Sequence, residues 1–121
     1  MPGEEAAVEW IAAADAKALL DAGEALAIDV REPAEVEATG TVPGAIAIPR
    51  GMIASAADPD SSDYDRRLKP ETPVILFCAS GKRSEMAGQT LLDLGYQRVH
   101  NLGGVKDWTE AGYALEPAAS D

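Results

Sequence analysis

The chain holds a single cysteine, Cys78, whose neighbours favour a reactive sulfur. Three small residues and then two cations follow it: Ala79, Ser80, Gly81, Lys82 and Arg83. A thiol is a nucleophile only as its thiolate. Inward-pointing loop amides, the positive end of a following helix and nearby cations each stabilise that anion relative to the neutral thiol. The spacing therefore indicates nucleophilic sulfur chemistry, and the structural alternative is an inert cysteine that closes a core strand.

The residues on either side of this loop predict the elements that position the sulfur. An unbroken apolar run, residues 74–77, comes directly before Cys78 and is typical of a strand buried on both faces. From about Ser84, apolar residues recur at spacings of four and three as far as Leu94, and Gly95 stands where a helix often ends. We therefore expect a strand, a loop and a helix, with Cys78 at the carboxyl end of the strand, where ligands bind in parallel α/β sheets.

The rest of the chain alternates in the same way. Short apolar runs predict further strands over residues 8–11, 25–30, 45–48 and 98–102, and helical patterns cover residues 12–22, 32–38 and 105–111. A polar loop is expected over residues 55–63. This alternation predicts an α/β fold with a mainly parallel sheet and helices on both faces. The 121 residues suit one domain over residues 8–117, with loose ends at 1–7 and 118–121.

Composition excludes several classes of function. The net charge of −11 argues against nucleic acid and anionic membranes as partners. No apolar run approaches the ~20 residues needed to span a bilayer, and the acidic first residues do not have the pattern of a secretory signal. One cysteine cannot form an internal disulfide. We expect a cytoplasmic protein that needs no cofactor and has no metal site.

Three other residue groups invite a chemical interpretation, and we expect each to be structural. Four charged residues, Asp29, Arg31, Glu32 and Glu35, predict an ion-pair cluster that fixes loops beside the cysteine, because no histidine accompanies the carboxylates and Arg31 can neutralise them. His100, the one histidine, falls in a predicted strand, where a structural or exposed role is commoner than catalysis. Trp10 is expected to anchor the first strand by packing.

The loop, residues 78–84, resembles the active-site loop of the rhodanese family of sulfurtransferases. Three further segments are similar to that family in the same order: 29–35, 40–49 and 102–112, which contain Asp-Val-Arg-Glu, Val-Pro-Gly-Ala and Leu-Gly-Gly-Val. The resemblance spans roughly residues 8–117. The family usually has a histidine where this chain has Thr41, a position that we interpret as structural. The resemblance implies a five-stranded sheet of the rhodanese type.

The resemblance also implies a function. It suggests a thiosulfate sulfurtransferase that moves a sulfane sulfur from thiosulfate, or a similar small anionic donor, through a persulfide on catalytic Cys78. The loop residues Ala79, Ser80, Gly81, Lys82, Arg83 and Ser84 would bind the donor and the anionic persulfide. The acceptor would be cyanide, a thiol or a sulfur-acceptor protein. Mercaptopyruvate stays open as a donor, although two cations suit thiosulfate better.

Two alternatives remain at this point. The first is a persulfide carrier or sulfur-relay module without turnover, since a chain with a lone cysteine has no resolving thiol and depends on an external acceptor. The second is a cysteine phosphatase or arsenate reductase. Phosphatase loops place five residues between cysteine and arginine, whereas four separate Cys78 from Arg83. A shorter loop closes on a smaller anion, which favours sulfur over phosphate.

Overall fold

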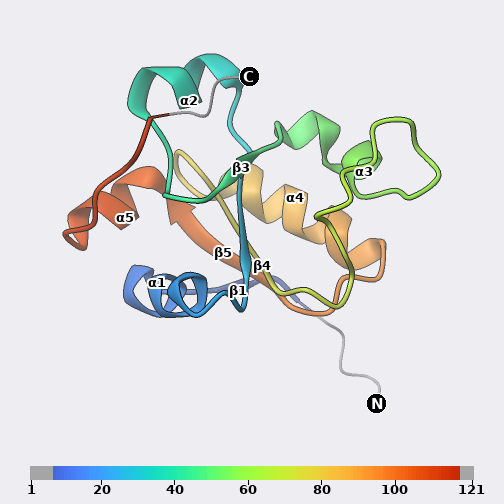
Figure 1. Ribbon diagram of the computed structural model, residues 1–121, viewed down its shortest axis with the longest axis horizontal. Helices are drawn as coiled ribbons and strands as arrows, with labels where there is room; N and C mark the ends of the chain where they lie inside the picture. Colours follow the sequence, from blue (N-terminus) through green and yellow to red (C-terminus); the bar gives the residue numbers. More distant parts are fainter. Residues whose placement is uncertain (1–6, 118–121) are drawn as a thin grey trace.

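Five short strands build one sheet in the computed structural model, which describes residues 7–117 (Figure 1). They are β1 (Glu9–Trp10), β2 (Leu26–Asp29), β3 (Ile46–Ala47), β4 (Val74–Cys78) and β5 (Val99–Gly104). Their order is β1-β5-β4-β2-β3, and every neighbouring pair is parallel. The strand that ends in the cysteine therefore lies at the centre of the sheet, which matches the prediction from its apolar run.

Helices cover both faces of this sheet, as the alternating pattern predicts. They are α1 (Ala13–Asp21), α2 (Pro33–Thr39), α3 (Ile53–Ala56), α4 (Lys82–Asp93) and α5 (Val105–Glu110), with a 3₁₀ turn η1 (Arg50–Met52) before α3. Figure 1 shows α1 and α5 on one side of the sheet and α3 and α4 on the other. The predicted α/β class and five-stranded parallel sheet are confirmed.

The central strand β4 divides the core in two, because successive side chains of a strand point to opposite faces. Leu76 and Cys78 belong to the cluster that packs against α3 and α4. Ile75 and Phe77 belong to the cluster under α1 and α5, where Trp108 is buried as the anchor of the last helix. The sulfur therefore faces α4, the helix that begins directly after its loop.

Two boundaries differ from the sequence prediction by two residues. Helix α4 begins at Lys82 rather than Ser84, because Gly81 adopts a left-handed conformation (φ +100°) and ends the loop two residues early. Strand β5 continues to Gly104 instead of ending at residue 102. The sequence prediction also missed η1 and α3 at residues 50–56, since one short turn cannot show a helical repeat.

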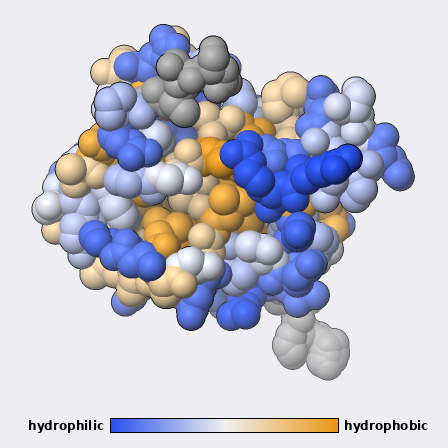
Figure 2. All heavy atoms as spheres, in the orientation of Figure 1, coloured by the Kyte–Doolittle hydropathy of each residue, from blue (hydrophilic) through white to orange (hydrophobic). Residues whose placement is uncertain are grey.

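The surface is mainly polar, as the charge predicts, but not uniformly so. The face drawn in Figure 2 has hydrophobic residues gathered near its centre and hydrophilic residues around them. Within residues 7–117 no helix is long and apolar enough to cross a membrane. The expected loose ends at 1–7 and 118–121 lie, apart from Ala7, outside the described residues.

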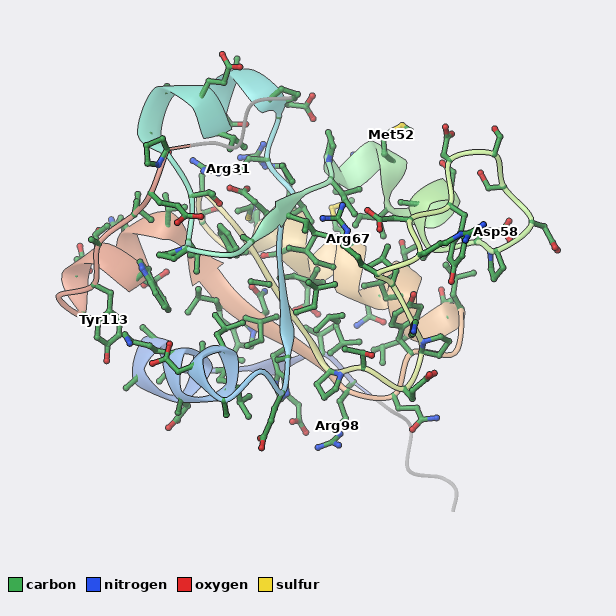
Figure 3. The ribbon with its side chains drawn as sticks, viewed as in Figure 1. Arg31, Met52, Asp58, Arg67, Arg98 and Tyr113 are labelled. Atoms are coloured by element: carbon green, nitrogen blue, oxygen red, sulfur yellow. The ribbon has the colours of Figure 1, made fainter. Side chains whose placement is uncertain are left out.

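A buried ion pair at the end of β2 ties the sheet to α2 (Figure 3, Arg31). The Nε and Nη2 atoms of Arg31 donate to the two carboxylate oxygens of Asp29 at 2.9 and 2.7 Å. The guanidinium also donates to Thr39 Oγ1 and to the carbonyl oxygen of Gly40, and Thr41 Oγ1 donates to Asp29. Both charged side chains are almost fully buried, so this part of the expected ion-pair cluster is structural.

The chain contains a second pair of the same shape in a different environment. Arg67 donates from its Nε and Nη2 to Asp65 at 2.9 and 2.6 Å, two residues apart in sequence as in the first pair. The side chain of Arg67 is 61% exposed, whereas that of Arg31 is 2% exposed. A comparison of the two pairs therefore separates the contribution of burial to stability from the contribution of hydrogen-bond geometry.

We expect Arg31→Leu to lower the free energy of unfolding by about 3–5 kcal/mol, because it leaves the Asp29 carboxylate buried without a counterion. The matched variant Arg67→Leu should cost less than about 1 kcal/mol, because Arg67 is exposed and Asp65, 20% exposed, stays in contact with solvent. Urea unfolding followed by circular dichroism measures both values. Equal losses in the two variants would contradict the assigned role of the buried pair.

Candidate active site

Cys78 is the last residue of β4 and pairs with Gly104 at the end of β5. The residue is 1% exposed, so its sulfur lies beneath the loop that follows. Ala79 and Ser80 are exposed on the outside of this loop, and Gly81 and Ser84 are buried beside the sulfur. The strand end, the loop and the first turn of α4 thus enclose the thiol.

Polar groups, not only aliphatic ones, face the sulfur. The backbone N–H of Gly81 donates to Cys78 Sγ at 3.0 Å, and Ser84 Oγ lies 3.4 Å from the same atom. A buried anion needs such donors, because an unpaired charge in a low-dielectric site is very unfavourable. The loop therefore supplies the hydrogen bonds that the sequence predicted from its small residues.

These contacts decide the ionisation of the thiol. Burial raises the pKa of Cys78, but hydrogen bonds from the Ser84 side chain and from the backbone of Ser84, Ser80 and Gly81 together lower it, and the net pKa is below the ordinary value of 9.0. Lowered pKa values are typical of reactive cysteines. The thiolate consequently persists to lower pH than that of an ordinary cysteine.

Glycines let the end of β5 lie directly against the loop. A Cβ atom on Gly104 would overlap the carbonyl oxygen of Ala79, and one on Gly81 would lie 2.5 Å from the ring of Trp10. A register shift between Leu76 and Phe77 brings Gly103 and Gly104 opposite the end of β4. The glycine pair therefore serves for close approach of two backbones within a strand.

Asn101 is the residue of this site that the sequence did not reveal. It lies in β5, is fully buried and bonds to three groups around the loop. Its Oδ1 accepts from Ser84 Oγ at 2.7 Å and from the Gly103 N–H at 2.9 Å, and its Nδ2 donates to the Gly81 carbonyl at 3.0 Å. A polar residue inside an apolar strand pattern was the available signal, because such a side chain needs buried partners.

The two loop cations lie in different surroundings. Arg83 forms two hydrogen bonds, 2.6 and 2.9 Å long, with the carboxylate of Glu35 in α2. This bonding lowers the pKa of Glu35 to about 2, so the pair stays charged at neutral pH and is lost only in strong acid. Lys82 is exposed, and no carboxylate within residues 7–117 pairs with it. Arg83 thus links the loop to α2, and Lys82 is left free to meet an anion.

A hollow of about 590 Å³ borders the outer side of the loop. Its lining joins the start of the sheet to α4: Val8, Trp10, Ser80, Gly81, Lys82, Glu85 and Met86. Trp10, which was expected to anchor the first strand by packing, lies with its ring over Gly81 and Gly103 but at the surface, where it is 63% exposed. Glycines below the ring leave room for it at the surface rather than in the core.

His100 lies away from this site. It is opposite Ile75 in the register, three residues before Cys78 along β4, and lines a depression near the amino ends of the strands together with Arg98. Figure 3 shows Arg98 at the opposite end of the molecule from Arg31. The expectation that the histidine has no catalytic contact therefore agrees with the geometry. No cluster of His, Cys, Asp and Glu within residues 7–117 could hold a metal ion.

Comparisons with known proteins point to one family. The profile of the rhodanese-like domain matches residues 12–111. The chain is 35% identical over 98 residues to a sulfurtransferase of Allochromatium vinosum, covering 80% of this chain and 83% of the relative. It is 34% identical over 101 residues to the human thiosulfate:glutathione sulfurtransferase, covering 78% and 87%.

A solved structure from Rhodopseudomonas palustris, described as a protein of unknown function and possible tyrosine phosphatase, has the same fold. It superposes with a TM-score of 0.82 at 34% identity, over 90% of this chain and 85% of that one. Fold, cysteine loop and sequence comparisons agree, and the chain belongs to the rhodanese-like domain family, whose relatives indicate a sulfurtransferase or sulfur-relay role.

Proposed function

We propose that this protein is a thiosulfate sulfurtransferase that passes sulfur to a thiophilic acceptor through a persulfide on Cys78. The observation that carries the proposal is the Gly81 N–H directed at Cys78 Sγ at 3.0 Å inside a buried loop. Donors that are fixed before reaction stabilise developing charge without reorganisation. They suit a sulfur that is anionic both before and after it takes up a second sulfur atom.

The first step is displacement at sulfur. The Cys78 thiolate attacks the outer sulfur of thiosulfate and forms a new S–S bond. The bond between the two sulfurs of thiosulfate breaks, and its electron pair leaves with sulfite. Loop amides from Ala79 to Ser84 stabilise the anionic persulfide, and Lys82 attracts the dianionic donor at short range. The net charge of −11 opposes the approach from afar, but salt screens it beyond roughly 8 Å.

The second step returns the enzyme to its starting state. An acceptor nucleophile, a thiol or cyanide, attacks the outer sulfur of the persulfide, and the electron pair of the S–S bond returns to Cys78 Sγ. The step needs no oxidant or reductant. Because Cys78 is the only cysteine, the nucleophile must come from outside the chain. A protein acceptor would make the same chemistry a sulfur relay.

Phosphate chemistry receives less support from the loop. Only Ala79, Ser80, Gly81 and Lys82 separate the cysteine from Arg83, and that arginine is bound to Glu35 rather than turned toward the sulfur. A phosphatase needs an arginine that holds the phosphoryl oxygens in a bidentate contact. Hydrolysis of an aryl phosphate by this chain would favour that alternative over sulfur transfer.

Intact mass after incubation with thiosulfate tests the persulfide directly. We expect the native chain to gain one sulfur atom, which cyanide then removes as thiocyanate. Cys78→Ser should gain none, because its hydroxyl is not a nucleophile of comparable strength toward sulfur. Equal loading of the two chains would refute the assignment. Loading without thiocyanate turnover would identify a carrier instead of an enzyme.

Lys82→Ala should raise the KM for thiosulfate about fivefold at low ionic strength, as expected from about 1 kcal/mol of Coulomb attraction in water. The effect should shrink as salt is added. Lys69→Ala removes another exposed lysine, five residues before the amino end of β4, and is the matched control, with an unchanged KM. Steady-state formation of thiocyanate measures both. If the KM of Lys82→Ala matches the control at low salt, Lys82 has no part in donor binding.

A further inference from the structure

We propose that Asn101 is a positioning residue. It holds Gly81 and Ser84, the two residues that contact Cys78 Sγ, in the arrangement that stabilises a sulfur anion. This proposal rests on the proposed function only because it takes the sulfur of Cys78 as the reacting atom. Asn101 does not touch the sulfur in the described contacts; it bonds to both residues that do. Its side chain crosses from β5 to the loop and is fully buried.

The backbone fixes which way the Asn101 amide points. Its oxygen faces the Gly103 N–H, which can only donate, and its nitrogen faces the Gly81 carbonyl, which can only accept. If the amide were flipped, its NH₂ group would face the Gly103 N–H and its oxygen would face the Gly81 carbonyl oxygen, and neither contact would be a hydrogen bond. The orientation is therefore imposed from two sides, and Ser84 Oγ at 2.7 Å must donate its one proton to Oδ1.

That assignment limits what Ser84 can do for the sulfur. A hydroxyl carries a single proton, so while Ser84 donates to Asn101 it can only accept from Cys78, which then is the neutral thiol. When the thiol ionises, the Ser84 proton can turn to Sγ; Asn101 Oδ1 then no longer accepts from Ser84 and keeps the Gly103 N–H. Asn101 thus orders the hydroxyl beside the neutral thiol, and its effect on the thiolate runs through Gly81.

The second route runs through Gly81. Asn101 Nδ2 donates to the carbonyl on one side of the Gly81 Cα, and the N–H on the other side donates to the sulfur. Gly81 is at φ +100°, a backbone conformation that glycine adopts without penalty and that needs external contacts to be held in one place. Removal of the Asn101 amide frees this residue, and its N–H loses its fixed direction toward Sγ.

No charged side chain near the cysteine loop bonds to the Asn101 side chain in the described contacts, so a change at Asn101 leaves these groups in place. They are Arg83 with Glu35, Asp29 with Arg31, Asp107 on the Gly104 N–H, and exposed Lys82. Loss of Asn101 therefore changes hydrogen bonding at the sulfur and not the surrounding charge.

The test is the pH dependence of Cys78 alkylation by iodoacetamide, which needs no sulfur donor. Asn101→Ala should shift the midpoint of the rate profile to higher pH and slow alkylation about tenfold below that midpoint, as for one pKa unit. Asn101→Ser, which keeps a small polar group, should shift it in the same direction. Ser84→Ala should give a smaller shift, because the Gly81 route remains.

Val99→Ala is the matched control, since it truncates a buried side chain of the same strand away from the loop. It should lower stability and leave the profile at the native midpoint. Midpoints of Asn101→Ala and Asn101→Ser that equal the native value would overturn the proposal and leave Asn101 a structural residue. Because alkylation is independent of thiosulfate, this outcome is separate from any failure of sulfur transfer.

Discussion

The cysteine sulfur buried at the end of a central strand is the constraint on which this structure depends, because a reactive sulfur must carry a negative charge there. Cys78 is 1% exposed, and water therefore does little to stabilise its charge. The protein must supply the donors itself, or the thiol stays neutral and inert. The Gly81 N–H, the Ser84 hydroxyl and the Asn101 amide that holds both meet this requirement with short, fixed bonds. The parallel sheet, in turn, fixes the strand ends from which these residues come.

The two loop cations contribute less to stabilising the Cys78 sulfur than the sequence suggests. Two adjacent cations follow the loop, yet one of them is bound by Glu35 and links α4 to α2. The dominant contribution at the sulfur comes from peptide dipoles and neutral side chains, which carry no counterion of their own. This division explains how a chain with a net charge of −11 can present a site for a small anion.

Most of the fold and the position of Cys78 were readable from the sequence because their signals are local. The apolar run before Cys78, the helical spacing after it and the order of the elements predict the sheet and place the cysteine at the end of its central strand. The role of Asn101, the surface position of Trp10 and the choice of Arg83 as the partner of Glu35 were not readable in this way. Each depends on a contact between strands or helices distant in sequence, and neither periodicity nor composition records which side chains meet across a sheet. Trp10 shows this limit, since an aromatic residue next to glycines at a strand edge can cover the surface instead of filling the core.

The two glycines at the end of β5 have a consequence for the cost of binding. They let the backbone of β5 contact the carbonyl of Ala79. The inner side of the loop is therefore lined by main chain, which moves less than side chains do. A donor that enters such a preformed ring immobilises few protein torsions. Binding therefore loses less conformational entropy than it would if a flexible loop had to close around the ligand. This matters for the proposed donor, thiosulfate, because an ion of five heavy atoms offers few contacts to offset such a loss.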